Sequence, residues 1–145
     1  PLDFNRADAN KIKNQINPKK IQSLFFSQIK YSEILHGFKE VSFKSITNSK
    51  LTLVTGIANS QPLKEYLKKN NVIFNHFDYP DHYNYSRKDV NKILATTKNN
   101  IILTTKKDYY KLSQFKIDNL LYIDIEVEFL DGKQEFLSII KEVLN

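Results

Sequence analysis

The pattern of apolar and polar positions becomes regular after residue 50. Short runs rich in Leu, Ile, Val and Phe are typical of buried strands. They alternate with stretches whose apolar residues recur every three or four positions, as in helices that cover a sheet. Strands are predicted at residues 51–55, 72–77, 101–104 and 120–125, with a pattern that allows the last to reach Phe129. Helices are predicted at residues 60–69, 86–97, 105–115 and 132–144. Four consecutive βα units predict an α/β fold, with a parallel sheet that carries helices on both faces.

Local signals mark the starts of two of these helices. Ser86 with Asp89, and Thr105 with Asp108, have the spacing of a helix N-cap and its partner three residues later. In the helix predicted at residues 132–144, one apolar stripe is expected to face inward. This stripe consists of Phe136, Ile139, Ile140 and Val143.

The first 50 residues have a less regular pattern. They predict a helix over residues 4–16, which ends before Asn17-Pro18, and a strand over residues 21–29. Residues 31–48 predict a short extended ribbon, because apolar and polar residues alternate around Val41 and Phe43. A polar break at residues 47–49 is the predicted boundary before the regular α/β part.

The chain is basic, with 22 Lys and Arg residues against 16 Asp and Glu residues and a net charge of +6. All of the basic residues except Arg6 and Arg87 are Lys, whereas base and phosphate recognition usually relies on the planar fork of Arg. The preferred interpretation is a solvated basic surface, and no nucleic-acid partner is predicted. A surface for an anionic partner, such as a membrane with anionic lipids, stays open as the alternative.

Several functional classes are excluded by composition. The 145-residue chain has only three Gly residues, so it can contain neither G-x-x-x-x-G-K-[ST] nor G-x-G-x-x-G. It has no Cys, and it lacks the His and Asp spacings of common metal sites, so no metal site is predicted in this chain. No apolar run approaches the roughly 20 residues of a membrane span. The absence of Met and the start at Pro1 indicate either a trimmed start or a piece of a longer protein.

Candidate chemistry lies in the loops that follow the predicted strands, because ligands of parallel sheets bind at the carboxyl edge. Asp81 and His82 could form an acid–base pair or merely a turn. Residues 104–108 combine two hydroxyls and two lysines at a helix start, which suits an anion or an ordinary cap. Gly56 suits either a ligand contact or only a tight turn. His36 and His76 are weaker candidates, and His76 is expected to be structural.

Aromatic residues bracket His82 and could contact a sugar or an acyl group. They are Phe74, Phe77, Tyr79, Tyr83 and Tyr85. The preferred interpretation places the two Phe side chains in the core and leaves the Tyr side chains half exposed.

Three segments, in this order and spacing, resemble one known family. They are LVTGIAN at residues 53–59, FDYPDHY at residues 77–83 and LTTKKD at residues 103–108. Together with FFSQIKY at residues 25–31, they resemble the C-terminal half of tetraacyldisaccharide 4'-kinase, the lipid A kinase of Gram-negative bacteria. The family patterns are approximately V-T-G-I-A-N, F-x-D-H-[HY] and T-T-E-K-D. Lys106 stands where the family usually has Glu.

The resemblance implies a two-domain P-loop NTPase with a Rossmann-like C-terminal domain. Its N-terminal domain would carry the Walker A loop, the carboxylates that bind Mg²⁺ and the catalytic Asp. The reaction would transfer the γ-phosphoryl group of ATP to the 4'-hydroxyl of a lipid A disaccharide 1-phosphate precursor. His82 would pair with the catalytic Asp, and Asp81 would orient the loop. The cleft-facing loops would contain Gly56, Asn59, Thr104, Thr105, Lys107 and Asp108.

The resemblance also implies a domain division. Residues 1–30 would be the end of the P-loop domain, residues 31–48 a connecting ribbon or hinge, and residues 49–145 the C-terminal α/β domain. This fragment would close the active site and be inactive alone. ATP and Mg²⁺ would be bound mainly outside it, and the protein would act as a monomer at the cytoplasmic side of the inner membrane.

Two other classes remain open from the residues alone. A non-enzymatic basic α/β module would bind an anionic polymer or membrane surface with a steep dependence on salt. A free-standing nucleotide-binding domain would need affinity for ATP without a P-loop.

Overall fold

The computed structural model describes residues 6–98 and 100–144, which group into two compact units. The sheet unit spans residues 31–125. The terminal unit combines the described residues up to Lys30 with those from Glu126 onward. This grouping differs from the predicted domains, which assigned residues 126–145 to the C-terminal domain. The domain division of the natural protein therefore stays a prediction.

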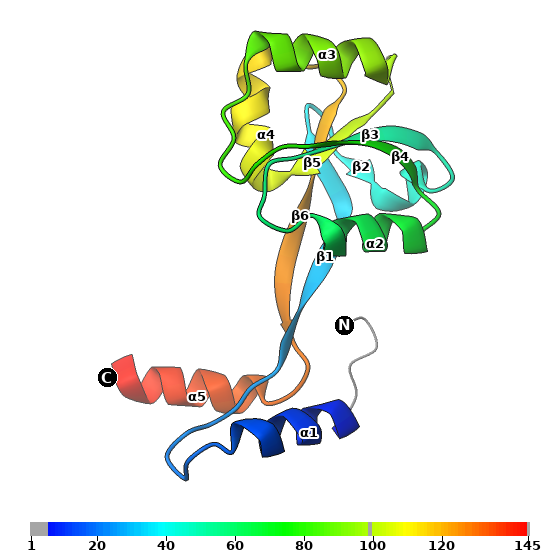
Figure 1. The fold of residues 1–145 in the computed structure, drawn as a ribbon. Coiled ribbons are helices and arrows are strands. Elements are labelled where there is room, and N and C mark those ends of the chain that lie inside the picture. The colour runs from blue at the N-terminus through cyan, green and yellow to red at the C-terminus, as the bar shows by residue number, and fades with distance from the viewer. Residues whose placement is uncertain (1–5, 99, 145) are drawn as a thin grey trace. The chain divides into compact units, whose positions relative to one another are not determined.

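Helices and strands alternate in the order that the hydrophobic pattern predicts for the second half of the chain (Figure 1). The strands are β1 (Ser27–Gly37), β2 (Val41–Ser42), β3 (Lys50–Thr55), β4 (Ile73–Asp78), β5 (Ile102–Thr105) and β6 (Leu120–Phe129). The helices are α1 (Arg6–Ile16), α2 (Gln61–Lys69), α3 (Arg87–Thr97), α4 (Lys106–Leu112) and α5 (Lys133–Leu144). Two short 3₁₀ segments are η1 (Phe43–Ile46) and η2 (Ser113–Phe115).

A single sheet has the strand order β2-β1-β6-β5-β3-β4. The pairs β3–β4, β3–β5 and β5–β6 are parallel, whereas β1 and β2 pair antiparallel. Figure 1 shows α2 on one face of this sheet and α3 and α4 on the other. The predicted α/β class, with a mostly parallel sheet between helices, is confirmed.

Alternate residues of β3 serve the two faces of the sheet. Leu53 belongs to the core on the α2 side, together with Leu63 and Leu67 of that helix. Val54 belongs to the core on the opposite side, which includes Val90 of α3 and other residues of α3 and α4. Both β3 side chains are fully buried. A central strand with two covered faces needs apolar residues at nearly every position, which explains the continuous run in its sequence.

Cap chemistry fixes the start of α3 as predicted. The Ser86 hydroxyl accepts a hydrogen bond from the Asp89 amide, and the Asp89 carboxylate accepts one from the Ser86 amide. These bonds satisfy amide groups that the helix itself leaves without partners. The loop after β4 therefore ends at Ser86, and α3 begins at the next residue.

The strand predicted at residues 21–29 is wrong in position, because β1 begins at Ser27 and continues to Gly37. The aromatic content of residues 25 and 26 suggested a strand. Phe25 instead packs edge-on against Phe136 of α5, with ring centroids 5.4 Å apart. An aromatic residue can therefore pack in a small core although it lies outside any helix or strand.

The ribbon predicted at residues 31–48 is only partly correct. Its middle forms the β1–β2 hairpin, but Phe43 and Ile46 lie in the 3₁₀ segment η1 and are both buried. Residues three positions apart lie on the same side of such a turn. Phe43 packs beside Tyr66 of α2, with ring centroids 5.0 Å apart.

The inward stripe predicted for α5 is only partly correct. Phe136 and Ile139 are half-buried, and the Phe136 ring contacts Phe25 and Phe129. No residue of α5 is fully buried, and Ile140 and Val143 are 40% and 77% exposed. Among the described helices, none has the length and apolar character to cross a bilayer.

Truncating the central strand tests this arrangement of the core. Leu53→Ala should lower the free energy of unfolding of the chain by about 2 to 5 kcal/mol, because it leaves a cavity among fully buried side chains. Ile73→Ala on β4 is the matched control, since that side chain is 62% exposed; its cost should stay below about 1 kcal/mol. Urea unfolding monitored by circular dichroism measures both values. Equal losses for the two variants would contradict the assigned position of β3.

Candidate functional site

The three candidate loops start at one edge of the sheet, as predicted. Thr55 at the end of β3 is level with Asp78 at the end of β4, and Val54 is level with Thr104 of β5. In parallel strands with matched register, the carboxyl ends lie side by side. The loops after β3, β4 and β5 therefore share the edge at which ligands of such sheets bind.

His82 occupies an exposed turn after β4. The Tyr83 amide donates to the Pro80 carbonyl oxygen over 3.2 Å, which closes the turn around Asp81 and His82. His82 has a positive φ of 60°, a conformation that few non-Gly residues adopt. Its side chain is 78% exposed. The imidazole is therefore accessible to solvent and does not pack in the core.

Asp81 bridges His82 and the loop after β5. Its carboxylate Oδ1 accepts hydrogen bonds from the His82 amide, at 2.9 Å, and from Lys107 Nζ, at 2.8 Å. The other oxygen, Oδ2, lies 3.7 Å from His82 Nε2. The Lys107 hydrogen bond, assisted by the bond from the His82 amide, lowers the pKa of Asp81. Exposed ion pairs add little stability, so the main effect of this bridge is orientation.

Asp108 is the buried centre of the site. Its side chain is fully buried, and Oδ2 accepts hydrogen bonds from the Gly56 amide over 2.9 Å and from the Thr105 hydroxyl over 2.8 Å. The Asp108 amide also donates to the Thr105 hydroxyl, which confirms the predicted cap of α4. One carboxylate thus joins the end of β3 to the start of α4.

The other predicted residues have separate positions. The Thr104 hydroxyl is fully buried and donates to the Val54 carbonyl oxygen within the sheet, over 2.7 Å. Asn59 is exposed, and its Oδ1 accepts from the Gln61 amide at the start of α2. The structure therefore brings together Gly56, Asp81, His82, Thr105, Lys107 and Asp108, whereas the Thr104 and Asn59 side chains make other contacts.

Lys106, the departure from the family pattern, also has a defined partner. Its Nζ lies 2.5 Å from Asp124 Oδ2 on β6. This hydrogen bond is the main cause that raises the pKa of Lys106 and lowers the pKa of Asp124. The two adjacent lysines therefore bind acids on different elements. Lys106 binds Asp124 on β6, and Lys107 binds Asp81 in the loop after β4.

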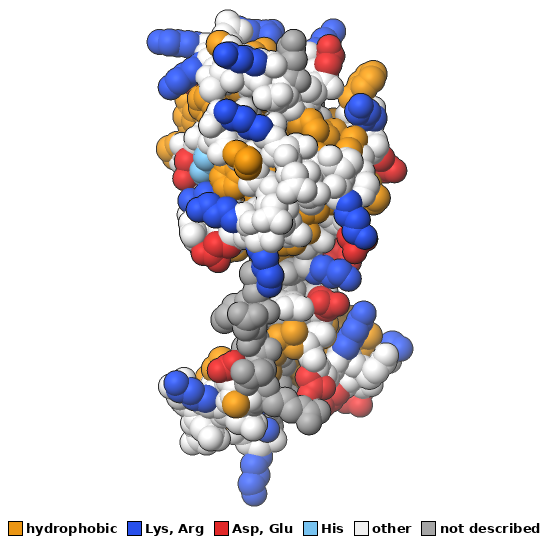
Figure 2. Space-filling view, turned by 90° about the vertical axis from the view of Figure 1, so that its right-hand side faces the viewer, with side chains coloured by type: hydrophobic (Ala, Val, Ile, Leu, Met, Phe, Trp, Pro, Cys, Tyr) orange, Lys and Arg blue, Asp and Glu red, His pale blue; other side chains and the backbone are white. Residues whose placement is uncertain are grey.

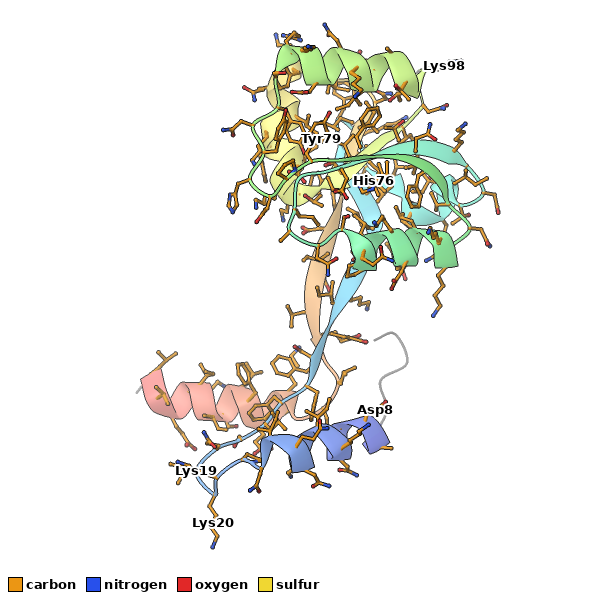
Figure 3. The ribbon with its side chains drawn as sticks, in the orientation of Figure 1. Asp8, Lys19, Lys20, His76, Tyr79 and Lys98 are labelled. Carbon is orange, nitrogen blue, oxygen red and sulfur yellow. The ribbon has the colours of Figure 1, made fainter. Side chains whose placement is uncertain are left out.

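A second polar group at this edge was not predicted. The Thr55 hydroxyl donates to Asp78 Oδ1 over 3.1 Å, and it lies 2.8 Å from His76 Nε2. The Thr55 hydroxyl has one proton, so His76 Nε2 is the donor in the tautomer that matches a Thr55 proton directed at Asp78. Figure 3 shows His76 on β4 and Tyr79 just beyond the end of that strand. The alternation of His76 and Asp78 beside Thr55 was the available signal.

This group lacks the connection of a nucleophile and its base. The Thr55 hydroxyl is fully buried and points its proton at a carboxylate, whereas a nucleophile must donate to the base and reach a substrate. Burial is the main cause that lowers the pKa of His76. The expectation of a structural His76 agrees with these contacts.

The tyrosines around His82 form a compact aromatic cluster. Tyr79 and Tyr83 stack with ring centroids 4.6 Å apart, and Tyr85 meets both rings edge-on. Tyr79 and Tyr83 are half-buried as expected, but Tyr85 is only 6% exposed. The expectation of a half-exposed side chain is therefore wrong for Tyr85, because a buried hydroxyl has no signature in the residue pattern.

Surface charge is dispersed. Figure 2 shows Lys and Arg side chains spread over the visible face, with Asp and Glu among them. Within residues 6–98 and 100–144, no group of three or more His, Asp or Glu side chains could hold a metal ion.

The sequence profile described as tetraacyldisaccharide-1-P 4'-kinase matches residues 3–145. The chain belongs to this family. It is 30% identical over 141 residues to tetraacyldisaccharide 4'-kinase of Flavobacterium psychrophilum, with 94% of this chain and 40% of the relative covered. It is 34% identical over 129 residues to the enzyme of Flavobacterium johnsoniae, with 85% and 37% covered. The chain thus spans about 40% of the length of these relatives.

A solved structure shares the fold. The crystal structure of "apo" form LpxK from Aquifex aeolicus in complex with ATP matches with a TM-score of 0.57. The match covers 88% of this chain and 40% of that chain, at 20% sequence identity. This likeness supports the α/β architecture of the tetraacyldisaccharide 4'-kinase family for the present chain.

The bridge at Asp81 can be tested by titration. Lys107→Met should raise the pKa of Asp81 toward its ordinary value, because the main hydrogen bond that lowers it is lost. Lys106→Met is the matched control: it should raise the pKa of Asp124 and leave that of Asp81 unchanged. Carboxyl ¹³C NMR from about pH 2 to pH 7 measures both groups.

The sign of the effect on stability follows from the same shift. The folded-state pKa of Asp81 is depressed, so the bridge stabilises the fold at neutral pH and this contribution is lost as the pH falls through that pKa. An unchanged pKa of Asp81 in Lys107→Met would show that the bridge is absent in solution.

Proposed function

We propose that this chain is the C-terminal part of an ATP-dependent tetraacyldisaccharide 4'-kinase. The intact protein would phosphorylate the 4'-hydroxyl of the lipid A disaccharide 1-phosphate precursor. Family membership supports this assignment. The observation that carries it is the exposed His82 turn at the carboxyl edge of the sheet, fixed through Asp81 and Lys107.

The nucleotide phosphates belong to another part of the protein in this proposal. With three Gly residues the chain cannot contain a P-loop, and its described residues include no cluster of acids or histidines for a metal ion. We therefore assign ATP and Mg²⁺ mainly to the remaining length that the relatives have and this chain does not span. What this chain contributes is a positioned imidazole with its supporting loops.

His82 acts on the acceptor hydroxyl through a second residue. Phosphoryl transfer depends mostly on positioning and charge stabilisation, and a carboxylate commonly accepts the proton of the attacking hydroxyl. His82 would pair with such a catalytic Asp of the N-terminal part and hold it in the productive orientation. Asp81 and Lys107 keep the histidine turn in place, so the imidazole meets that carboxylate when the loops close over the site.

The domain division remains part of the proposal. Residues 1–30 would complete the P-loop domain, residues 31–48 would act as the hinge, and residues 49–145 would form the C-terminal domain. The protein would work as a monomer, attached peripherally to the cytoplasmic face of the inner membrane where its acylated substrate resides. The net charge of +6 is compatible with anionic headgroups on that face.

Turnover of the natural-length protein tests the assigned role. It should transfer phosphate from ATP to a tetraacyldisaccharide 1-phosphate acceptor, and His82→Ala should lower kcat by about 100-fold or more, as expected when an acid–base element is lost. His36→Ala is the matched control, because the contacts of His36 are with the exposed Glu40 and the Tyr122 ring and not with the His82 turn. Thermal unfolding should be nearly unchanged in both variants. Full activity of His82→Ala would contradict the role of the turn.

The chain alone should neither hydrolyse ATP nor phosphorylate the acceptor. It lacks the phosphate-binding loop, so isothermal titration should show no ATP binding at concentrations at which the natural-length protein is saturated. ATP affinity of the isolated chain would instead favour a free-standing nucleotide-binding domain. Tight binding to anionic vesicles, with a steep salt dependence and no phosphoryl transfer by the natural-length protein, would favour the basic binding module.

A further inference from the structure

Two buried oxygens in the site have no hydrogen-bond partner of ordinary geometry among the described residues. They are Asp108 Oδ1 and the Tyr85 hydroxyl oxygen. Asp108 is fully buried and Tyr85 is 6% exposed. Buried polar atoms without partners cost free energy, so two of them at one place indicate that they serve each other.

The two oxygens converge beside Gly56. A Cβ atom added to Gly56 would lie 2.9 Å from Asp108 Oδ1 and 2.9 Å from the Tyr85 hydroxyl oxygen. Any side chain at position 56 would therefore separate them. The glycine, which sequence reasoning took for a tight turn or a ligand contact, leaves the space in which a phenol can approach a carboxylate.

The protonation state suits such a bond. Burial, followed by the charge of the neighbouring Asp108 carboxylate, raises the pKa of Tyr85. The phenol therefore keeps its proton at neutral pH, and the carboxylate oxygen that faces it can only accept. Oδ2 of the same carboxylate is already used by Gly56 and Thr105, which leaves Oδ1 for the phenol.

Tyr85 lies at the end of the loop that carries His82. Its ring contacts Tyr79 and Tyr83 edge-on, and α3 begins at Arg87. The Lys111 ammonium group of α4 donates to the Tyr83 carbonyl oxygen over 2.8 Å. Helix α4 thus holds the His82 loop at its middle and faces it with a buried carboxylate at its end.

The geometry points to Tyr85 as a positioning residue: its hydroxyl donates to Asp108 Oδ1, and this buried pair fixes the His82 loop against the end of β3. The inference deepens the proposed function, on which its consequence for turnover rests. Tyr85 is buried and does not touch the substrate. It acts through the backbone of residues 79–86 and through Asp108, which in turn binds the Gly56 amide.

The first measurement is hydrogen exchange in the natural-length protein. Tyr85→Phe removes one oxygen and keeps the ring, so the core packing is preserved. The Gly56 amide, which donates to Asp108, should exchange about tenfold faster, whereas the Leu53 amide within β3 should be unaffected. Tyr110→Phe is the matched control, because that side chain is 67% exposed and its loss of an oxygen should change neither amide.

The second measurement separates positioning from a merely structural role. With ATP and the lipid acceptor, Tyr85→Phe should lower kcat about tenfold and leave KM within about twofold, because a displaced His82 turn affects the transition state more than binding. In a double-mutant cycle, Tyr85→Phe should have little further effect on kcat once Asp108→Ala has removed the acceptor.

Each outcome decides one of the two claims. Unchanged exchange at Gly56 in Tyr85→Phe overturns the hydrogen bond, whatever the activity. A changed exchange with kcat within twofold of the unsubstituted protein overturns the positioning role. If the unsubstituted natural-length protein transfers no phosphate, the proposed function fails, and the exchange result still decides whether Tyr85 and Asp108 pair.

Discussion

The hydrogen bond from the Gly56 amide to the Asp108 carboxylate joins residues that lie 52 positions apart in the chain. Removing a carboxylate from water is costly unless donors surround it. Asp108 has such donors in Gly56 and Thr105, and Tyr85 faces its remaining oxygen. The end of β3, the start of α4 and the loop after β4 therefore meet at one buried group. Local displacement of any of the three would remove one of the groups that surround the buried carboxylate, which couples the three segments to one another.

The parallel sheet makes this meeting possible. Matched register places the ends of β3, β4 and β5 at one edge, and cores on both faces prevent the strands from sliding. The exposed His82 turn is attached to this sheet through two hydrogen bonds. The Asp81 carboxylate accepts one from the His82 amide and one from Lys107 at the start of α4. In the proposed kinase role, this chain would contribute one imidazole to a site assembled elsewhere, which requires a buried anchor and an exposed turn.

Much of the sheet unit could be predicted, because its signals are local and repeated. The strand at residues 51–55 and the caps at Ser86 and Thr105 follow from residue type and spacing. The predictions of strands and buried faces failed where an apolar residue makes a tertiary contact without belonging to the expected element. Phe25 suggested a strand but packs against Phe136, and Val143 of the predicted α5 stripe is 77% exposed.

The candidate site shows the same limit. Family resemblance and the position of loops at the carboxyl edge identified Asp81, His82 and Asp108 as neighbours. Neither could distinguish the buried Thr104 hydroxyl from the accessible His82 turn, since burial depends on which face of a strand a residue occupies. Tyr85 was expected to be half exposed but is buried, and the pattern gave no sign of this because Asp108, beside which its hydroxyl lies, is 23 positions later in the sequence. Contacts of this kind become visible only when the folded chain is at hand.

The most direct test of the central claim is a crystal structure of the natural-length protein with an ATP analogue and the lipid acceptor. The account predicts that a nitrogen of the His82 ring lies within hydrogen-bond reach, about 2.6 to 3.2 Å, of a carboxylate from the N-terminal part, with that carboxylate beside the 4'-hydroxyl. Asp81 should still bind Lys107. A His82 ring that points into solvent, away from the acceptor hydroxyl and from every carboxylate of the N-terminal part, would contradict the account.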